Sequence, residues 1–197
     1  SPKILLKAFE EVKPNLILTV PLILEKIYKK MILPQLSKTT MKVALNIPLL
    51  DSRIYAQIRK KLVDAFGGRF REVIVGGAAM NEEVTNFLYK IKFPFTIGYG
   101  MTECGPLISY DHNDEYVPGS CGQILKGIMK VRIDSEDPYN KVGEIQVSGE
   151  NVMKGYYKNE EATSKVFTED GWLRTGDLGT IDADNRIYIR GRSKTMI

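Results

Sequence analysis

Three short segments of the chain combine glycine with side chains that could bind a ligand. They are Gly76–Ala79, Gly98–Glu103 and Arg174–Asp177. The first two directly follow apolar runs typical of β-strands, where small residues let backbone amides approach a ligand closely. In an open α/β sheet, ligands bind in the crevice outside the carboxyl ends of the strands. None of the segments matches the P-loop or the dinucleotide-binding fingerprint, and each alone is also typical of a plain turn. Their joint occurrence is what indicates a binding site.

The composition argues against several other kinds of site. Cys104 and Cys121 are too few and too isolated for a disulfide framework or a zinc site. With His112 as the only histidine, a His-based metal centre or a Ser-His-Asp triad is not expected. The net charge of +4 is spread along the chain without a basic stripe of interleaved aromatics, which argues against a nucleic-acid partner. No run approaches the roughly 18 apolar residues of a membrane span, and the cysteine usage indicates a reducing, cytoplasmic compartment.

The elements that must position these segments alternate between strand and helix in the first half of the chain. We expect strands at 16–20, 73–75 and 95–97. The first is a continuous apolar run, as in a strand covered on both faces. We expect helices from Pro21 to a stop at Pro34, from the N-caps Asp51 or Ser52 to Gly67, and from the N-cap Asn81 onward. This order predicts a layered βαβ region with a mainly parallel sheet.

After about Pro118 the pattern changes to that of antiparallel strands. Apolar residues alternate with polar ones at 129–133 and at 145–148, and Ile187 and Ile189 follow the polar turn 182–185. These are hairpin patterns, and they predict a small antiparallel, barrel-like or twisted sheet. We therefore expect an α/β subdomain at 1–117, a β-rich subdomain at 118–190, and the start of a hinge at 191–197.

Four ordered blocks of the sequence resemble those of the adenylate-forming, or AMP-binding, enzyme superfamily, which includes acyl-CoA synthetases, luciferases and peptide-synthetase adenylation domains. Tyr99–Glu103 is similar to its Tyr-Gly-x-Thr-Glu signature. The later blocks are Gly143–Gly149 with Gly155–Tyr157, Gly171–Asp177, and Gly191–Lys194. The opening of the chain, with Glu11–Pro14, Val20–Pro21 and Glu25–Tyr28, is similar to the long-chain fatty acyl-CoA synthetase branch.

The resemblance implies a reaction in two steps, with ATP, Mg²⁺ and coenzyme A as its cofactors and a fatty acid as its substrate. The carboxylate attacks the α-phosphate of ATP, pyrophosphate leaves, and an acyl-adenylate forms. The thiol of coenzyme A then attacks this mixed anhydride. Repulsion between the two anions of the first step must be overcome by a cation and by positioned hydrogen-bond donors.

The resemblance also implies roles for individual residues. Glu103 would bind Mg²⁺, Thr102 would donate its hydroxyl to the α-phosphate, and Arg192 would reach the ribose or a phosphate. Tyr99 would stack on adenine, and Asp177 would accept hydrogen bonds from both ribose hydroxyls. The small residues Gly77, Ala78 and Ala79 would line the adenine and acyl-chain side, and Met101 would border the acyl tunnel. The nucleotide-binding set is completed by Gly98 and Gly100.

Two parts of the family pattern are not found in this sequence. One is the Ser/Thr/Gly-rich loop that clamps the β- and γ-phosphates, and the other is the small C-terminal domain with its catalytic lysine. Lys194 aligns with the hinge about which that domain rotates. We therefore expect a central fragment of a longer ligase, inactive by itself, whose partners include the missing N- and C-terminal parts of its own chain.

Other interpretations remain open. The acid could be an aryl, short-chain or amino acid, because the motifs of these branches overlap. The isolated chain could also be a non-catalytic nucleotide-binding or structural module. A fatty acyl product is compatible with peripheral membrane contact, although the sequence has no evident amphipathic anchor.

Overall fold

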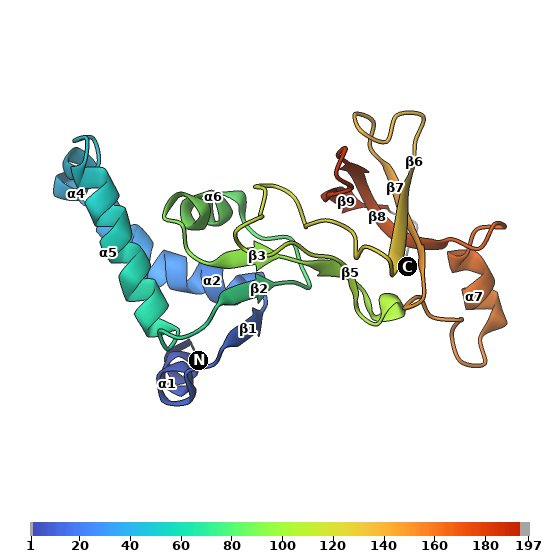
Figure 1. Cartoon of the computed structure of the whole chain (residues 1–197), viewed down its shortest axis with the longest axis horizontal. Helices are drawn as coiled ribbons and strands as arrows, with labels where there is room; N and C mark the ends of the chain where they lie inside the picture. The colour runs from blue at the N-terminus through green and yellow to red at the C-terminus, as the bar shows by residue number, and fades with distance from the viewer. Residues whose placement is uncertain (1, 194–197) are drawn as a thin grey trace. The chain divides into compact units, whose positions relative to one another are not determined.

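The computed structural model describes residues 2–193, which divide into two compact units (Figure 1). Within the described residues, the first unit extends up to Thr96 and the second begins at Ile97. Each unit is a mixture of helices and strands, with a parallel sheet in the first and antiparallel sheets in the second, as the sequence predicts. The sequence-based division at 117 and 118 stays a prediction, and Lys194 lies outside the described residues.

The first unit is built on a three-stranded sheet in the order β1-β2-β3. The strands are β1 (Leu16–Thr19), β2 (Glu72–Val75) and β3 (Phe95–Ile97), which confirms all three expected strands. β1 and β2 run parallel, with Ile17 opposite Val73. Ile17, Val73 and Val75 are buried, so this face of the sheet contributes to the core.

One expectation about β1 is wrong. Leu16 and Leu18 are exposed, so the described residues cover only one face of this strand. Alternate side chains of a strand point to opposite faces of the sheet, so Ile17 is buried on one face while Leu16 and Leu18 are exposed on the other. The continuous apolar run therefore did not distinguish a strand covered on both faces from one covered on a single face.

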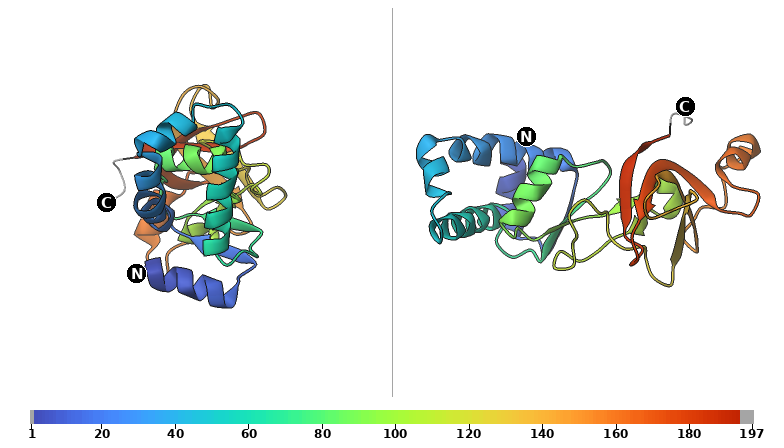
Figure 2. Two further views of the ribbon diagram at one scale, coloured as in Figure 1. Left: turned by 90° about the vertical axis from the view of Figure 1, so that its left-hand side faces the viewer. Right: turned by 90° about the horizontal axis from the view of Figure 1, so that it is seen from above.

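The first unit also contains several helices (Figure 2). They are α1 (Pro2–Val12), α2 (Pro21–Ile27), a π-helical turn at Tyr28–Ile32, α3 (Leu33–Leu36), α4 (Thr39–Ala44), α5 (Leu50–Ala65) and α6 (Glu82–Lys90). Pro21 begins α2 and the Asn81 side chain caps α6 by accepting from the Val84 amide, both as expected. Gly67 follows α5 with a φ of 92°, the left-handed conformation expected of it.

Two helix boundaries differ from the prediction. Pro34 does not stop the helix before it, because it lies in the first turn of α3, where proline removes no hydrogen bond. The N-cap of α5 is Leu49, not Asp51 or Ser52, and its side chain makes no capping bond. Asp51 instead accepts a hydrogen bond from the Ser52 amide at 2.6 Å, one residue inside the helix.

An aromatic cluster holds α1 and α5 together in the first unit. The ring of Phe66, which is fully buried, lies 5.4 Å from Phe9, 5.9 Å from Phe70 and 5.7 Å from Phe93, centroid to centroid. Such stacked and tilted pairs add about 0.5–1.5 kcal/mol each beyond the area that they bury. The cluster therefore anchors both helices beside the sheet.

The second unit contains a small hairpin and a larger antiparallel sheet. The hairpin pairs β4 (Tyr99–Gly100) with β5 (Leu107–Ser109). The sheet has the order β6-β7-β8-β9. Its strands are β6 (Met129–Asp134), β7 (Gly143–Gly149), β8 (Leu173–Ile181) and β9 (Ile187–Arg192), and α7 (Glu160–Val166) lies between β7 and β8 in the chain.

The core of the second unit includes apolar residues whose alternation predicts β6, β7 and β9, and residues of β5 and β8 that the sequence analysis did not assign to strands. Ile145, Leu173 and Ile187 are fully buried, together with Ile108 of β5. The strand order leaves β6 and β9 at the two edges, so the sheet is open and does not close into a barrel. Among the described residues, no helix has both the length and the apolar character needed to cross a membrane.

Candidate active site

The segment Tyr99–Glu103 leaves β4 and enters a short 3₁₀ turn at Thr102–Cys104. Its shape depends on Gly100, where a Cβ atom would collide with the carbonyl oxygen of Pro106. That oxygen accepts a hydrogen bond from the Met101 amide at 2.8 Å. The turn places Thr102 at the surface, where its hydroxyl is accessible to a ligand, and leaves Glu103 half-buried.

Tyr99 connects this segment to Asp177, a residue 78 positions away in the chain. Its hydroxyl donates to Asp177 Oδ2 at 2.8 Å, and Arg192 Nε donates to Asp177 Oδ1 at 2.9 Å. Asp177 and Arg192 lie opposite each other because β8 and β9 pair in this register, after a β-bulge between Leu178 and Gly179. Three of the residues expected at the nucleotide site are thus brought into contact around one carboxylate.

Burial makes this contact strong. Tyr99 is 6% exposed and Asp177 is 7% exposed, so little water competes for their hydrogen bond. Burial raises the pKa of Tyr99 well above its usual range, and the negative charge of Asp177 adds to the effect. Tyr99 therefore stays protonated as a donor. Its ring belongs to the core of the second unit, and its stacking on adenine stays a prediction.

Arg192 is different because its side chain remains 78% exposed. The hydrogen bond and charge of Asp177 raise the pKa of Arg192 above its already high value. Arg192 is therefore a permanent cation that is fixed at Nε and remains accessible to an anionic ligand.

Thr175 shapes the turn that carries Asp177. Its side chain is fully buried, and its hydroxyl donates to the carbonyl of Ile145 at 2.8 Å. The same hydroxyl accepts a hydrogen bond from the Asp177 amide at 3.1 Å. Gly176 between them has a φ of 71°, in the left-handed region that glycine adopts without strain. This explains why the segment needs a hydroxyl and a glycine before the aspartate.

The sequence prediction gave no role to two residues that contact the signature segment. The Tyr156 hydroxyl donates to Glu103 Oε1 at 2.8 Å, and the Asn151 side-chain amide donates to the Cys104 carbonyl at 2.6 Å. Burial and the Glu103 hydrogen bond both raise the pKa of Tyr156. Gly155–Tyr157 does form part of a recognised sequence block, which was the available signal for Tyr156.

Gly77, Ala78 and Ala79 belong to the first unit and follow β2 directly. All three are exposed, and Gly77 has a φ of 85° with open space where a Cβ would lie. The strand-to-helix connection therefore presents a surface of small residues, as expected for backbone approach to a ligand. Gly98, in the second unit, is buried.

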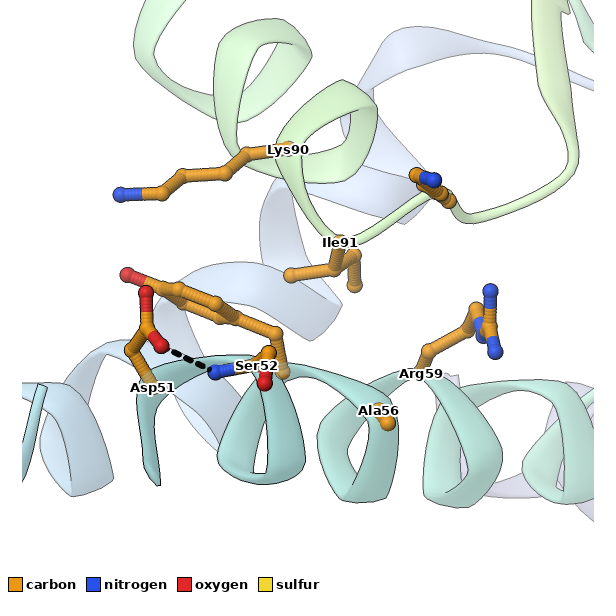
Figure 3. A pocket seen from close by; sticks show the side chains of 8 residues that line it. Asp51, Ser52, Ala56, Arg59, Lys90 and Ile91 are labelled. Carbon is orange, nitrogen blue, oxygen red and sulfur yellow. Dashed lines mark hydrogen bonds between the residues drawn. The ribbon is translucent and has the colours of Figure 1, made fainter. Parts of the chain in front are cut away.

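A cavity of about 380 Å³ lies elsewhere in the first unit, between α5 and the end of α6 (Figure 3). Asp51, Ser52 and Arg59 contribute from α5, and the Lys90 ammonium lies 4.8 Å from the centre of the Tyr55 ring. Within the described residues, its lining includes none of the predicted nucleotide-binding residues. We therefore do not assign the cavity to the active site.

The comparison with known protein families agrees with the motif that contains Glu103. The sequence model of the AMP-binding enzymes matches residues 1–157. The chain belongs to the AMP-binding enzyme family. The family assignment expected from the four sequence blocks is thus confirmed.

Relatives within the AMP-binding family differ in their acids. The chain is 36% identical over 163 residues to 4-coumarate-CoA ligase 1 of Narcissus pseudonarcissus. This alignment covers 76% of this chain and 30% of that protein. It is 29% identical over 205 residues to long-chain-fatty-acid–CoA ligase 1 of Saccharomyces cerevisiae, covering 95% of this chain and 29% of that protein. The family is therefore established, and the long-chain branch is not singled out.

Solved structures agree with this assignment. The crystal structure of ATP-bound MatB from Rhodopseudomonas palustris matches with a TM-score of 0.70 and 26% identity, covering 100% of this chain and 34% of that chain. The chain thus spans about a third of the length of the relatives that it matches.

Proposed function

We propose that the chain is a central part of an ATP-dependent acid–CoA ligase, which forms an acyl-adenylate and then transfers the acyl group to coenzyme A. The observation that carries the proposal is the buried contact between Tyr99 and Asp177. It joins the signature segment to the aspartate expected to bind the ribose, and these two segments would form the two halves of an adenylate site.

Asp177 has the capacity that ribose binding requires. A carboxylate offers about four lone-pair sites, and Tyr99 and Arg192 each use one. The remaining sites can accept the two ribose hydroxyls without breaking either bond. Because both oxygens are already oriented, the ligand does not have to order the carboxylate, which favours tight binding.

Thr102 and Glu103 would act on the phosphates. Among the described residues no group of three potential metal ligands occurs, so a dedicated protein cage for a cation is not expected there. Mg²⁺ is usually bound by one or two carboxylates together with substrate phosphates, and the half-buried Glu103 fits that arrangement. When bound, Mg²⁺ would neutralise phosphate charge, while the Thr102 hydroxyl would donate to the α-phosphate.

For the acid, we propose a long-chain fatty acid. The similarity to the yeast long-chain-fatty-acid–CoA ligase extends over 95% of this chain. An aryl acid such as 4-coumarate is the second candidate, because the identity to the 4-coumarate ligase is higher although it covers 76% of the chain. Competition between a long-chain fatty acid, 4-coumarate and malonate for the full-length protein discriminates between these acids. A cytoplasmic location, the hinge role of Lys194 and peripheral membrane contact stay predictions.

Calorimetric titration with AMP and with Mg²⁺·ATP tests the nucleotide site, first on the 197-residue chain and then on the full-length protein that contains it. Asp177→Asn should weaken binding by about 10-fold or more, because a hydrogen bond to a charged group contributes about 1.5–3 kcal/mol. The matched control is Asp114→Asn, which makes the same charge change at an exposed position of the same unit. Equal affinities of the two variants for AMP in the full-length protein would refute the ribose role.

The catalytic role of Glu103 is tested separately by acid-dependent pyrophosphate exchange in the full-length protein. Glu103→Ala removes the anionic ligand of Mg²⁺ and should suppress exchange strongly. Near-normal exchange in this variant would contradict the assignment. If the full-length protein binds AMP but exchanges no pyrophosphate with any acid, the chain is a non-catalytic nucleotide-binding module instead.

A further inference from the structure

The segment that follows β7 holds the signature turn in place. We call residues 151–156 the brace segment. The backbone amide of Met153 donates to the Glu103 carbonyl at 2.7 Å. The side-chain amide of Asn151 donates to the Cys104 carbonyl at 2.6 Å and to the Leu107 carbonyl at 2.9 Å. The two hydrogen bonds of Asn151 join it to residues that lie 47 and 44 positions earlier in the sequence.

The orientation of Asn151 follows from its partners. Two carbonyl oxygens face one end of the side chain, and only the NH₂ group can donate to both. Its Oδ1 is buried and has no hydrogen-bond partner among the described residues. Burying an unpaired acceptor is costly, so the two donated bonds must outweigh this cost. The turn at Thr102–Cys104 is thus held from outside and does not depend on its own short 3₁₀ hydrogen bonds alone.

Tyr156 extends the brace segment to the carboxylate itself. Its hydroxyl lies 2.8 Å from Glu103 Oε1, although the two residues are 53 positions apart. The backbone of Tyr156 is fixed in turn by α7, because its amide donates to Thr163 Oγ1 at 2.9 Å. Thr163 then donates to the Asn159 carbonyl at 2.8 Å, at the start of the helix. The Tyr156 hydroxyl is therefore presented to Glu103 from an anchored backbone.

We propose that Tyr156 is a positioning residue that orients the Glu103 carboxylate for its ligand. The inference rests on the proposed role of Glu103 as the protein's carboxylate for Mg²⁺. The hydroxyl occupies one lone-pair site of Oε1 and leaves the other sites of the carboxylate for the ion. A neutral donor suits this task, because a lysine or arginine at the same place would carry a positive charge and would compete with Mg²⁺ for the negative charge of the Glu103 carboxylate. Partners of this kind typically change metal affinity or activity by 10- to 100-fold.

Tyr157 provides a matched control for the experiment. It is 88% exposed, whereas Tyr156 is 37% exposed. Tyr156→Phe removes the hydroxyl and keeps the ring, and Tyr157→Phe makes the same change one residue away. In the full-length protein, pyrophosphate exchange is measured as a function of Mg²⁺ concentration. Tyr156→Phe should raise the Mg²⁺ concentration for half-maximal exchange by about 10-fold, at the lower end of the range because the pair is partly exposed. Tyr157→Phe should leave it unchanged.

A second readout needs no catalysis. Urea unfolding of the 197-residue chain is followed by the fluorescence of Trp172, its only tryptophan, which lies in the same unit as the Tyr156–Glu103 pair. Tyr156→Phe should lower the folded-to-unfolded ratio by about five-fold, and should have little further effect when Glu103 is already alanine. A hydroxyl that acts on some other group would give equal effects in both backgrounds.

The outcomes separate the inference from the proposed function. If Glu103→Ala leaves exchange and its Mg²⁺ dependence normal, the metal role of Glu103 is wrong. If Glu103→Ala suppresses exchange while Tyr156→Phe and Tyr157→Phe have the same Mg²⁺ dependence, Tyr156 is not a positioning residue and the proposed function stands.

Discussion

Replacing Tyr99 by phenylalanine removes one hydroxyl from the contact that joins the two motifs. The O–H···O distance to Asp177 is 2.8 Å, and both residues are almost entirely buried. A hydrogen bond to a charged group contributes about 1.5–3 kcal/mol, and phenylalanine fills the same space without leaving a cavity. Asp177 Oδ1 keeps its bond from Arg192, whereas Oδ2 loses its donor. We expect Tyr99→Phe to lower the free energy of unfolding by about 2 kcal/mol, toward the middle of this range.

Urea unfolding of the chain at neutral pH, followed by Trp172 fluorescence, measures this loss. Trp172 and Tyr99 belong to the same unit, so the probe reports on the unfolding of the structure that contains the contact. The dependence of the free energy on urea concentration should not change, because the variant exposes no additional surface. For a chain of this length, about 2 kcal/mol corresponds to a fall of roughly 4–8 °C in the melting temperature.

Two controls decide whether the loss comes from the hydrogen bond. Tyr157→Phe removes a hydroxyl from an exposed tyrosine and should change stability by less than about 0.5 kcal/mol. In an Asp177→Ala background, Tyr99→Phe should have little effect, because the acceptor is absent. An equal loss in both backgrounds, or a loss no larger than that of Tyr157→Phe, would refute the reasoning.

Three further predictions follow from the second unit and from the turn after β2. Asn151→Ala should destabilise the chain by about 2–3 kcal/mol in urea unfolding, because the carbonyls of two residues lose their donor. Gly100→Ala should destabilise more than Gly77→Ala. A Cβ at Gly100 collides with backbone, whereas at Gly77 it meets open space and is strained only by the φ of 85°; similar losses would contradict the close approach. Burial raises the pKa of Cys104 to about 11, so the folded state keeps a proton that the unfolded thiol loses above about pH 8.5. The stabilisation is complete below that pH and is lost as the pH rises to about 11, by about 1.4 kcal/mol per pH unit. In Cys104→Ala, the free energy of unfolding should therefore decline less steeply with pH over this range than in the unchanged chain.

Much of the fold could be predicted because the relevant signals are local. All three strands of the first unit coincide with apolar runs, and the alternation at 129–133 and 145–148 predicts strands of the antiparallel sheet. The cap at Asn81 follows from a side chain that bonds three residues ahead. The errors at Pro34 and Leu49 concern helix ends, where neighbouring turns and packing determine which residue begins the helix.

In the candidate site, too, some features could be read from the sequence and others depended on the tertiary structure. The sequence by itself determined which residue types are present at Thr102, Glu103 and Asp177, and their order was sufficient to indicate the AMP-binding family. The tertiary structure decided which of them touch. Asp177 meets Arg192 through the register of β8 and β9, which includes a bulge, and meets Tyr99 across 78 residues of chain.

The contact of Tyr156 with Glu103 has the same origin. It depends on where α7 and the end of β7 place a backbone that lies 53 residues from its partner. Local sequence patterns report on conformations within a few residues, because caps, turns and amphipathic faces are formed by near neighbours. Hydrogen bonds between distant segments are selected by strand register and packing, which only the folded chain specifies.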